Sequence, residues 1–171
     1  MELQVKDLSF RSVEISDGAI LKEWLMDPVI LHWFPMVDER EVDDAVSVWM
    51  NYSLVGAGIV ALWQGSVCGF FNLYIQPFKK TRHTSLFSII VDPKLRGKGI
   101  GRSLIEEGEK LAVEKYHIEI LHLEVYEGNP AEKLYARLGY EVYGRQDRFT
   151  KENGAYRAKV CMQKILQTLG S

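Results

Sequence analysis

The glycine-rich basic stretch at residues 96–101 constrains this chain more than any other feature. It reads Arg96-Gly97-Lys98-Gly99-Ile100-Gly101 and separates an apolar run at residues 85–91 from a long segment at residues 100–116. The run is rich in β-branched and aromatic residues and stops before Pro93, which predicts a strand. The segment repeats apolar residues three and four positions apart, which predicts a helix. We therefore expect a central strand, a loop and a helix packed on the sheet.

The three glycines of this loop predict an anion-binding site. Positions without a side chain let a ligand approach the backbone, and the first N–H groups of the following helix point outward. A P-loop requires Gly-Lys followed by Ser or Thr, whereas Gly99 follows Lys98. A Rossmann turn requires two residues between its last two glycines, whereas one separates Gly99 from Gly101. A glycine-rich turn with solvated cations is the alternative, and we favour the phosphate site.

Two motifs resemble those of the GNAT N-acetyltransferases. The pattern Val91-x-Pro93-x-x-Arg96-x-x-Gly99-x-Gly101 is similar to the acetyl-CoA loop of that family. Downstream, residues 129–140 (NPAEKLYARLGY) are similar to its following helix. The resemblance implies acetyl-CoA as cosubstrate, with contacts from the strand, the loop and the second motif: Ile89, Ile90, Val91, Arg96, Gly97, Lys98, Gly99, Ile100, Gly101, Arg102, Asn129 and Lys133.

The resemblance also implies a mechanism in which the acceptor amine attacks the thioester directly. A backbone N–H of the strand would stabilise the oxyanion. The tyrosine of the family corresponds to Tyr135, whose phenol would donate a proton or a hydrogen bond to the leaving thiolate. The alternative for Tyr135 is a core tyrosine, and Asn129 would either hold the pantetheine arm or order the turn.

The general base is not assigned by the motifs. Many members of the family carry a Glu near the start of the strand, but Ser85 and Leu86 stand there. Three candidates remain: Glu124 and His122, which share one face of a predicted strand, and His83 just before residues 85–91. Each also has a purely structural interpretation.

The acceptor stays open between a peptide N-terminus, a polyamine and an aminosugar. Deprotonating a lysine-like amine at neutral pH costs roughly 4 to 5 kcal/mol and an α-amine roughly 1 kcal/mol, so a weak base favours α-amines. An acidic cluster beside the aromatic connector at residues 29–36 would instead attract a polyamine or an aminosugar, although such residues also stabilise a helix N-terminus. It comprises Asp38, Glu39, Glu41, Asp43 and Asp44. Residues 144–162, with Glu23-Trp24-Leu25 and Trp33-Phe34, resemble spermidine, aminoglycoside and ribosomal-protein acetyltransferases.

Composition limits the remaining possibilities. The 171 residues are 47% hydrophobic, which predicts one globular domain over residues 1–171. The resemblance implies that this domain is GNAT-like. A net charge of −2 argues against nucleic acid and anionic membranes as partners. Cys68 and Cys161 lack metal-binding spacing, so we expect two buried free thiols and no metal. The N-terminus lacks a signal pattern and no apolar run reaches the roughly 20 residues of a membrane span, which predicts a cytoplasmic protein, either monomer or homodimer.

The remaining patterns predict a mixed, mostly antiparallel α/β sheet with helices on both faces, which the resemblance also implies. Expected strands cover residues 8–11, 58–63, 67–76, 85–91, 120–126, 140–150 and 156–165. Expected helices begin at residue 16 or 17, at residue 38, after the glycine-rich loop and at residue 130. The function expected is acetyl transfer to a primary amine. The alternative is a non-catalytic domain that binds or senses acyl-CoA.

Overall fold

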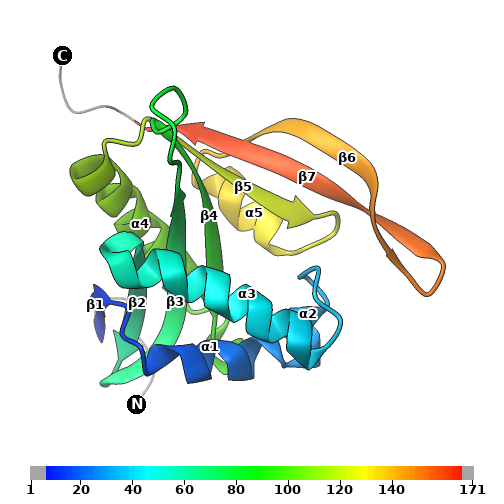
Figure 1. Ribbon diagram of the computed structural model, residues 1–171, viewed down its shortest axis with the longest axis horizontal. Coiled ribbons are helices and arrows are strands. Elements are labelled where there is room, and N and C mark those ends of the chain that lie inside the picture. Colours follow the sequence, from blue (N-terminus) through cyan, green and yellow to red (C-terminus); the bar gives the residue numbers. More distant parts are fainter. Residues whose placement is uncertain (1–6, 167–171) are drawn as a thin grey trace.

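A seven-stranded sheet crosses the computed structural model, which describes residues 7–166 (Figure 1). The strands are β1 (Leu8–Ser12), β2 (Gly58–Trp63), β3 (Ser66–Ile75), β4 (Thr84–Val91), β5 (Ile120–Tyr126), β6 (Glu141–Glu152) and β7 (Ala155–Ile165). Their spatial order is β1-β2-β3-β4-β5-β7-β6. Only β4 and β5 pair in parallel, whereas the other five neighbouring pairs are antiparallel. The predicted mixed, mostly antiparallel sheet with a central β4 is confirmed.

Helices cover both faces of the sheet, as predicted. On one face lie α1 (Asp17–Leu25), α2 (Pro28–Leu31) and α3 (Glu39–Tyr52), and on the other lie α4 (Ile100–Tyr116) and α5 (Ala131–Arg137) (Figure 1). Successive side chains of a strand point to opposite faces. Phe70 therefore belongs to the core under α1 and α3, and Phe71 to the core under α4 and α5.

The helix α4 packs closely against the sheet through a small residue. Four apolar side chains of its predicted stripe are buried, as is Gly108, while Leu111 is half-buried. A Cβ at Gly108 would overlap the ring of Phe71, so only glycine lets the helix approach this closely. This close approach positions the N-terminus of α4 beside the end of β4.

The structure differs from the prediction in two local details. The connector at residues 29–36 contains the last three residues of the short helix α2, which begins at Pro28 and is capped by Asp27, whose Oδ1 accepts a hydrogen bond from Val29 N at 2.8 Å. Proline suits the first position of a helix, where its missing N–H costs no hydrogen bond. Both cysteines are free, but only Cys68 is buried, because Cys161 lies half-exposed on β7.

Candidate active site

The central feature of the site is a gap between β4 and β5. The two strands pair from Thr84 with Ile120 to Leu86 with His122, and no farther. Beyond that rung β4 continues to Val91 and β5 to Tyr126, and Figure 1 shows the two strands diverging. Backbone groups of β4 that face this gap have no β5 partner, so they are available to hydrogen-bond a ligand.

The alternating direction of the backbone N–H groups along β4 decides which of them face the gap. Asp92 N donates to Cys68 O of β3 at 3.0 Å. Backbone N–H groups alternate sides along a strand, so Ile90 also turns its N–H toward β3. Ile89 and Val91 therefore direct theirs to the gap. Of the three strand residues that the resemblance suggested, Ile90 is the one whose backbone is engaged within the sheet.

The loop between β4 and α4 presents several backbone donors beside this gap. Gly97 and Gly99 have φ of 75° and 85°, which turn the chain into the helix. Ser103 N makes the first bond of α4 to Gly99 O at 3.1 Å, and no side chain caps the helix. The preceding N–H groups, together with the helix dipole, have the arrangement that is expected of an anion-binding site. The geometry agrees with the sequence-based prediction of an anion site.

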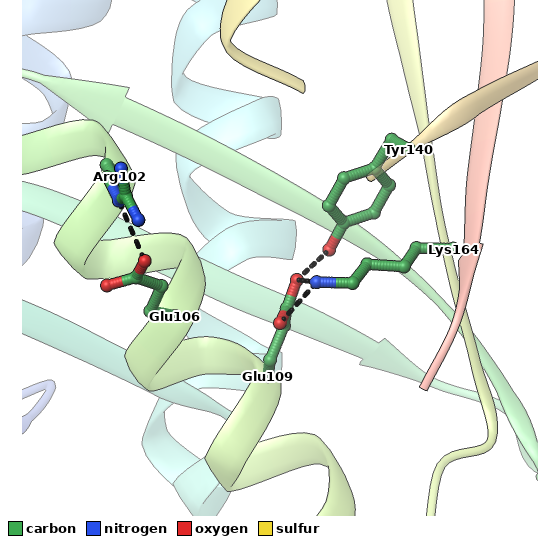
Figure 2. Close-up of polar contacts among 5 residues, drawn as sticks. All are labelled: Arg102, Glu106, Glu109, Tyr140 and Lys164. Carbon is green, nitrogen blue, oxygen red and sulfur yellow. Dashed lines mark hydrogen bonds and ion pairs between the residues drawn. The ribbon is translucent and has the colours of Figure 1, made fainter. Parts of the chain in front are cut away.

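Other residues assigned to this loop differ in what they contact. Arg96 and Lys98 are exposed beside the loop. Arg102 pairs through Nε with Glu106 Oε1 at 2.8 Å on the surface of α4, as Figure 2 shows. Ile100 is buried in the core. A Cβ at Gly101 would lie 3.2 Å from Leu134 Cδ2, so Gly101 permits the packing of α5 against α4.

The second motif places Tyr135 beside the start of the gap. Its ring is buried, with its centroid 6.2 Å from that of Phe87, the first β4 residue beyond the last paired rung. Burial raises the pKa of the Tyr135 phenol, so the hydroxyl stays protonated at ordinary pH. No hydrogen bond to that hydroxyl is found within residues 7–166, so the proton is free for a ligand. Asn129 Oδ1 accepts from Ala131 N at 2.9 Å and orders the turn, while Lys133 is exposed.

A polar cluster behind Tyr135 fixes the orientation of α4 and α5. Tyr140 donates to Glu109 Oε1 at 3.0 Å, and Lys164 Nζ contacts both oxygens of Glu109 at 2.8 Å (Figure 2). Burial, followed by the charge of Glu109, raises the pKa of Tyr140. Tyr140 also lies next to Tyr135, with ring centroids 6.3 Å apart. These contacts join α4 and β7 to the segment between α5 and β6.

The candidate bases occupy the opposite face of the sheet. Leu121 and Leu123 point into the core under α4, so His122 and Glu124 project to the other face. Burial lowers the pKa of His122, and the nearby charge of Glu124 partly opposes this. Glu124 Oε1 is paired with Lys159 Nζ at 3.0 Å. His83 precedes β4, at the end where the two strands are paired, so the structure does not bring it to the gap.

A pocket of about 280 Å³ adjoins this face and contains residues that the sequence did not single out. It lies between the connector that follows α1 and the hairpin of β6 and β7. Tyr126 and Arg157 line it. The Tyr126 hydroxyl is buried without a hydrogen-bond partner in the described residues, and burial raises its pKa to about 12. Arg157 contacts His32, which is 125 positions away, so no local pattern could have linked them.

The acidic cluster is largely used by the structure itself. Asp38 Oδ1 accepts from Glu41 N at 2.9 Å, and Glu41 Oε2 accepts from Val37 N at 2.8 Å, which caps α3. Lys22 pairs with Glu39 at 2.8 Å and with Asp43 at 2.7 Å. None of the five acidic residues lines the pocket. Their charge therefore acts mainly on the helix N-terminus and on Lys22.

Two further observations concern the described part of the chain. Within residues 7–166, no group of three or more His, Cys, Asp or Glu is placed to hold a metal ion. No helix there has the length and apolar content that a membrane crossing requires.

Comparison with known proteins finds several that are similar to this chain. Residues 21–140 match the Acetyltransferase (GNAT) family. The L-amino acid N-acetyltransferase AaaT of Escherichia coli (strain K12) is 27% identical over 99 residues, which are 57% of this chain. That match spans 61% of AaaT, less than two thirds of its length.

Solved structures share the fold over nearly the whole chain. A ribosomal-protein-alanine N-acetyltransferase from Brucella melitensis is 27% identical, with a TM-score of 0.76 over 92% of this chain and 99% of that one. The protein yncA from Salmonella typhimurium, solved with its cofactor acetyl-CoA, has a TM-score of 0.78 over 96% and 97% of the two chains. At 22% identity, this second likeness concerns the fold alone.

Proposed function

The chain belongs to the acetyltransferase (GNAT) family, and we propose that it transfers an acetyl group from acetyl-CoA to a primary amine by direct attack. One observation carries the proposal. The gap-facing N–H groups of Ile89 and Val91 lie at the end of β4, and the uncapped N-terminus of α4 follows directly after the glycine-rich loop. The N–H groups of β4 can hydrogen-bond the thioester end of acetyl-CoA, and the N-terminus of α4 can bind its pyrophosphate.

Residues of the chain supply four functions in this proposal. Acetyl-CoA provides the acetyl group as a thioester. The N-terminus of α4 binds phosphate, while Ile89 N or Val91 N donates to the carbonyl oxygen. Tyr135 donates its hydroxyl proton to the sulfur from the side of α5. His122, neutral because burial lowers its pKa, accepts the amine proton on the other face.

The base candidates favour an α-amine as the acceptor. Glu124 is held in an ion pair with Lys159, whereas the imidazole of His122 makes no hydrogen bond within the described residues. Neutral imidazole is a weak base. It can deprotonate an α-amine, with a pKa near 8, more readily than a lysine-like amine, with a pKa near 10.4. Two relatives are named for acceptors of this kind: one is an L-amino acid N-acetyltransferase and the other a ribosomal-protein-alanine N-acetyltransferase. Both names agree with an α-amine as the acceptor. A polyamine has less support because the acidic cluster is engaged elsewhere.

Binding and turnover experiments test the function separately. Titration calorimetry should show binding of acetyl-CoA, because the backbone donors are already arranged in the absence of a ligand. A thiol-release assay over a panel of α-amines, polyamines and aminosugars should then show turnover with α-amines. Binding without turnover of any amine would favour the acyl-CoA-sensing alternative. Absence of acetyl-CoA binding would refute both.

Replacing Gly97 with Ala should weaken acetyl-CoA binding about tenfold. The position beside Gly97 is open, and a Cβ there would enter space that we assign to the phosphates. Gly65→Ala is the matched control, because Gly65 has φ of +79° against +75° at Gly97 and equally open surroundings. Both variants carry the strain of a left-handed alanine, but Gly65 lies in the turn between β2 and β3. Equal affinities for both variants in calorimetry would contradict the phosphate site.

A further inference from the structure

The pocket beside Tyr126 combines an apolar wall with one guanidinium. Pro28, Leu31, Phe34 and Met36 contribute the apolar side, and the hairpin of β6 and β7 contributes the charged side. Lys151 and Glu152 also line it, and their charges are opposite. Arg157 therefore determines the net charge of the lining. At about 280 Å³, the pocket suits a small molecule.

Arg157 is held in place by contacts that leave part of its guanidinium available. Nη1 donates to His32 O at 3.0 Å, and Nη2 lies 3.1 Å from His32 Nε2. The guanidinium carbon lies 5.1 Å from the centroid of the Trp33 ring. A guanidinium has five N–H donors, so several remain for a ligand. Because the side chain is already ordered, little entropy is lost when an anion binds.

Arg157 also has no carboxylate partner in residues 7–166. Its neighbours on the same hairpin differ, since Lys159 pairs with Glu124, and Arg145 pairs with Glu127 and Asp147. A half-buried, ordered arginine inside a pocket but without a counter-ion is typical of a site for a carboxylate or another anion. Arg148 and Lys151 of this hairpin also lack a carboxylate partner in the described residues, but both are exposed and lie over the Tyr156 ring, whereas Arg157 is half-buried.

Tyr126 lines the same pocket. The residue is 7% exposed, and its buried hydroxyl has no hydrogen-bond partner in the described part of the chain. Burial and then the charge of Glu124 raise the pKa of Tyr126, and the charge of Arg157 opposes them. Because the hydroxyl itself is shielded from solvent, Tyr126 forms part of the pocket wall, and the anion is assigned to Arg157.

We propose that Arg157 binds a carboxylate of the acceptor, so that the preferred substrate is a free amino acid with an apolar side chain. This inference rests on the proposed acetyl transfer for the role of the molecule as an acceptor. It adds that the acceptor is a zwitterion, held at its acidic group by the hairpin and at its apolar group by the connector.

Calorimetry on the protein saturated with coenzyme A tests the carboxylate site without requiring turnover. The probes are leucine, methionine and phenylalanine, each beside its own neutral amide. Each amino acid should bind about tenfold more tightly than its amide, as expected for a charge-assisted hydrogen bond. The preference should vanish in Arg157→Gln and persist in part in Arg157→Lys. Arg148→Gln is the control, because Arg148 stacks on Tyr156 on the same hairpin and does not line the pocket.

The outcomes separate this inference from the proposed function. Amides that bind as well as amino acids, a preference that survives in Arg157→Gln, or no binding by any of the three amino acids would overturn it. Acetylation of amides and acids at equal kcat/KM would leave the acetyltransferase function standing and remove the carboxylate site. Binding that depends on Arg157, without thiol release from acetyl-CoA, would support the site and contradict acetyl transfer.

Discussion

Replacing Tyr135 with Phe should lower kcat about 100-fold while the affinity for acetyl-CoA changes little. The substitution keeps the ring, which packs beside Phe87 and Tyr140, and removes only the hydroxyl. Because burial raises the pKa of this phenol, it remains a proton donor across the range in which the enzyme would be assayed. The wild-type kcat should therefore show no alkaline decline due to Tyr135 up to pH 9. Steady-state kinetics with a fixed amine, together with calorimetry, measure both quantities.

Tyr140→Phe provides the matched control for Tyr135. It also removes a buried phenol hydroxyl, but one that donates to Glu109, whereas no hydrogen bond of the Tyr135 hydroxyl is found within residues 7–166. Its loss should reduce the free energy of unfolding by about 1 kcal/mol and leave kcat near the wild-type value. If Tyr135→Phe retains wild-type kcat between pH 6 and 9, the tyrosine is structural and the sulfur is protonated by water. If both variants lose kcat equally, the effect comes from packing.

Replacing His122 with Gln should lower kcat/KM about 100-fold and remove the acid limb of the pH profile. Burial disfavours the imidazolium, so the pKa of His122 lies below its ordinary value of 6.5. The ring is then neutral at pH 7 and able to accept a proton. As the pH falls through this lowered pKa, the ring becomes protonated and the wild-type rate should decline. Glutamine retains polarity at this position but cannot act as a base at any of these pH values.

Glu124→Gln distinguishes the two remaining base candidates. The carboxylate of Glu124 raises the pKa of His122, in opposition to burial. Removing that charge should therefore shift the acid limb to lower pH if His122 is the base. The same variant should abolish the limb and most of the activity if Glu124 is the base. A wild-type limb in His122→Gln would contradict the role of His122 directly.

The proposed acid and the proposed base lie on opposite faces because side chains alternate along the central strands. Phe87 and Tyr135 lie on the side of α4 and α5, whereas His122 projects to the side of α1 and α3. The thioester would enter the gap between them, with the sulfur toward Tyr135 and the amine arriving from the pocket. In this proposal the sheet separates the two proton-transfer groups, so the core on each face sets the pKa of one of them.

Local sequence determined most of the framework of this protein. The periodicity of residues 100–116 predicted α4, and the glycine spacing predicted the loop, because both depend on the conformations of neighbouring residues. The turn at Asn153 and Gly154, with φ of 48° and 80°, was likewise predictable from two residues that adopt positive φ readily. The sequence could assign Tyr135 to a helix because most of its motif consists of that helix and the residues that flank it.

Tertiary structure alone decided which of these residues meet. Local sequence could not show that β5 separates from β4 after His122, or that the N–H of Ile89 rather than that of Ile90 faces the gap. It also could not show that the missing side chain of Gly101 makes room for Leu134. Arg157 reaches His32 across 125 positions because the final hairpin lies beside the connector that follows α1. Periodicity and spacing report contacts within an element, whereas these contacts arise from the packing of elements distant in the chain. The pocket, its unpaired arginine and its unpaired tyrosine exist only after that packing is complete.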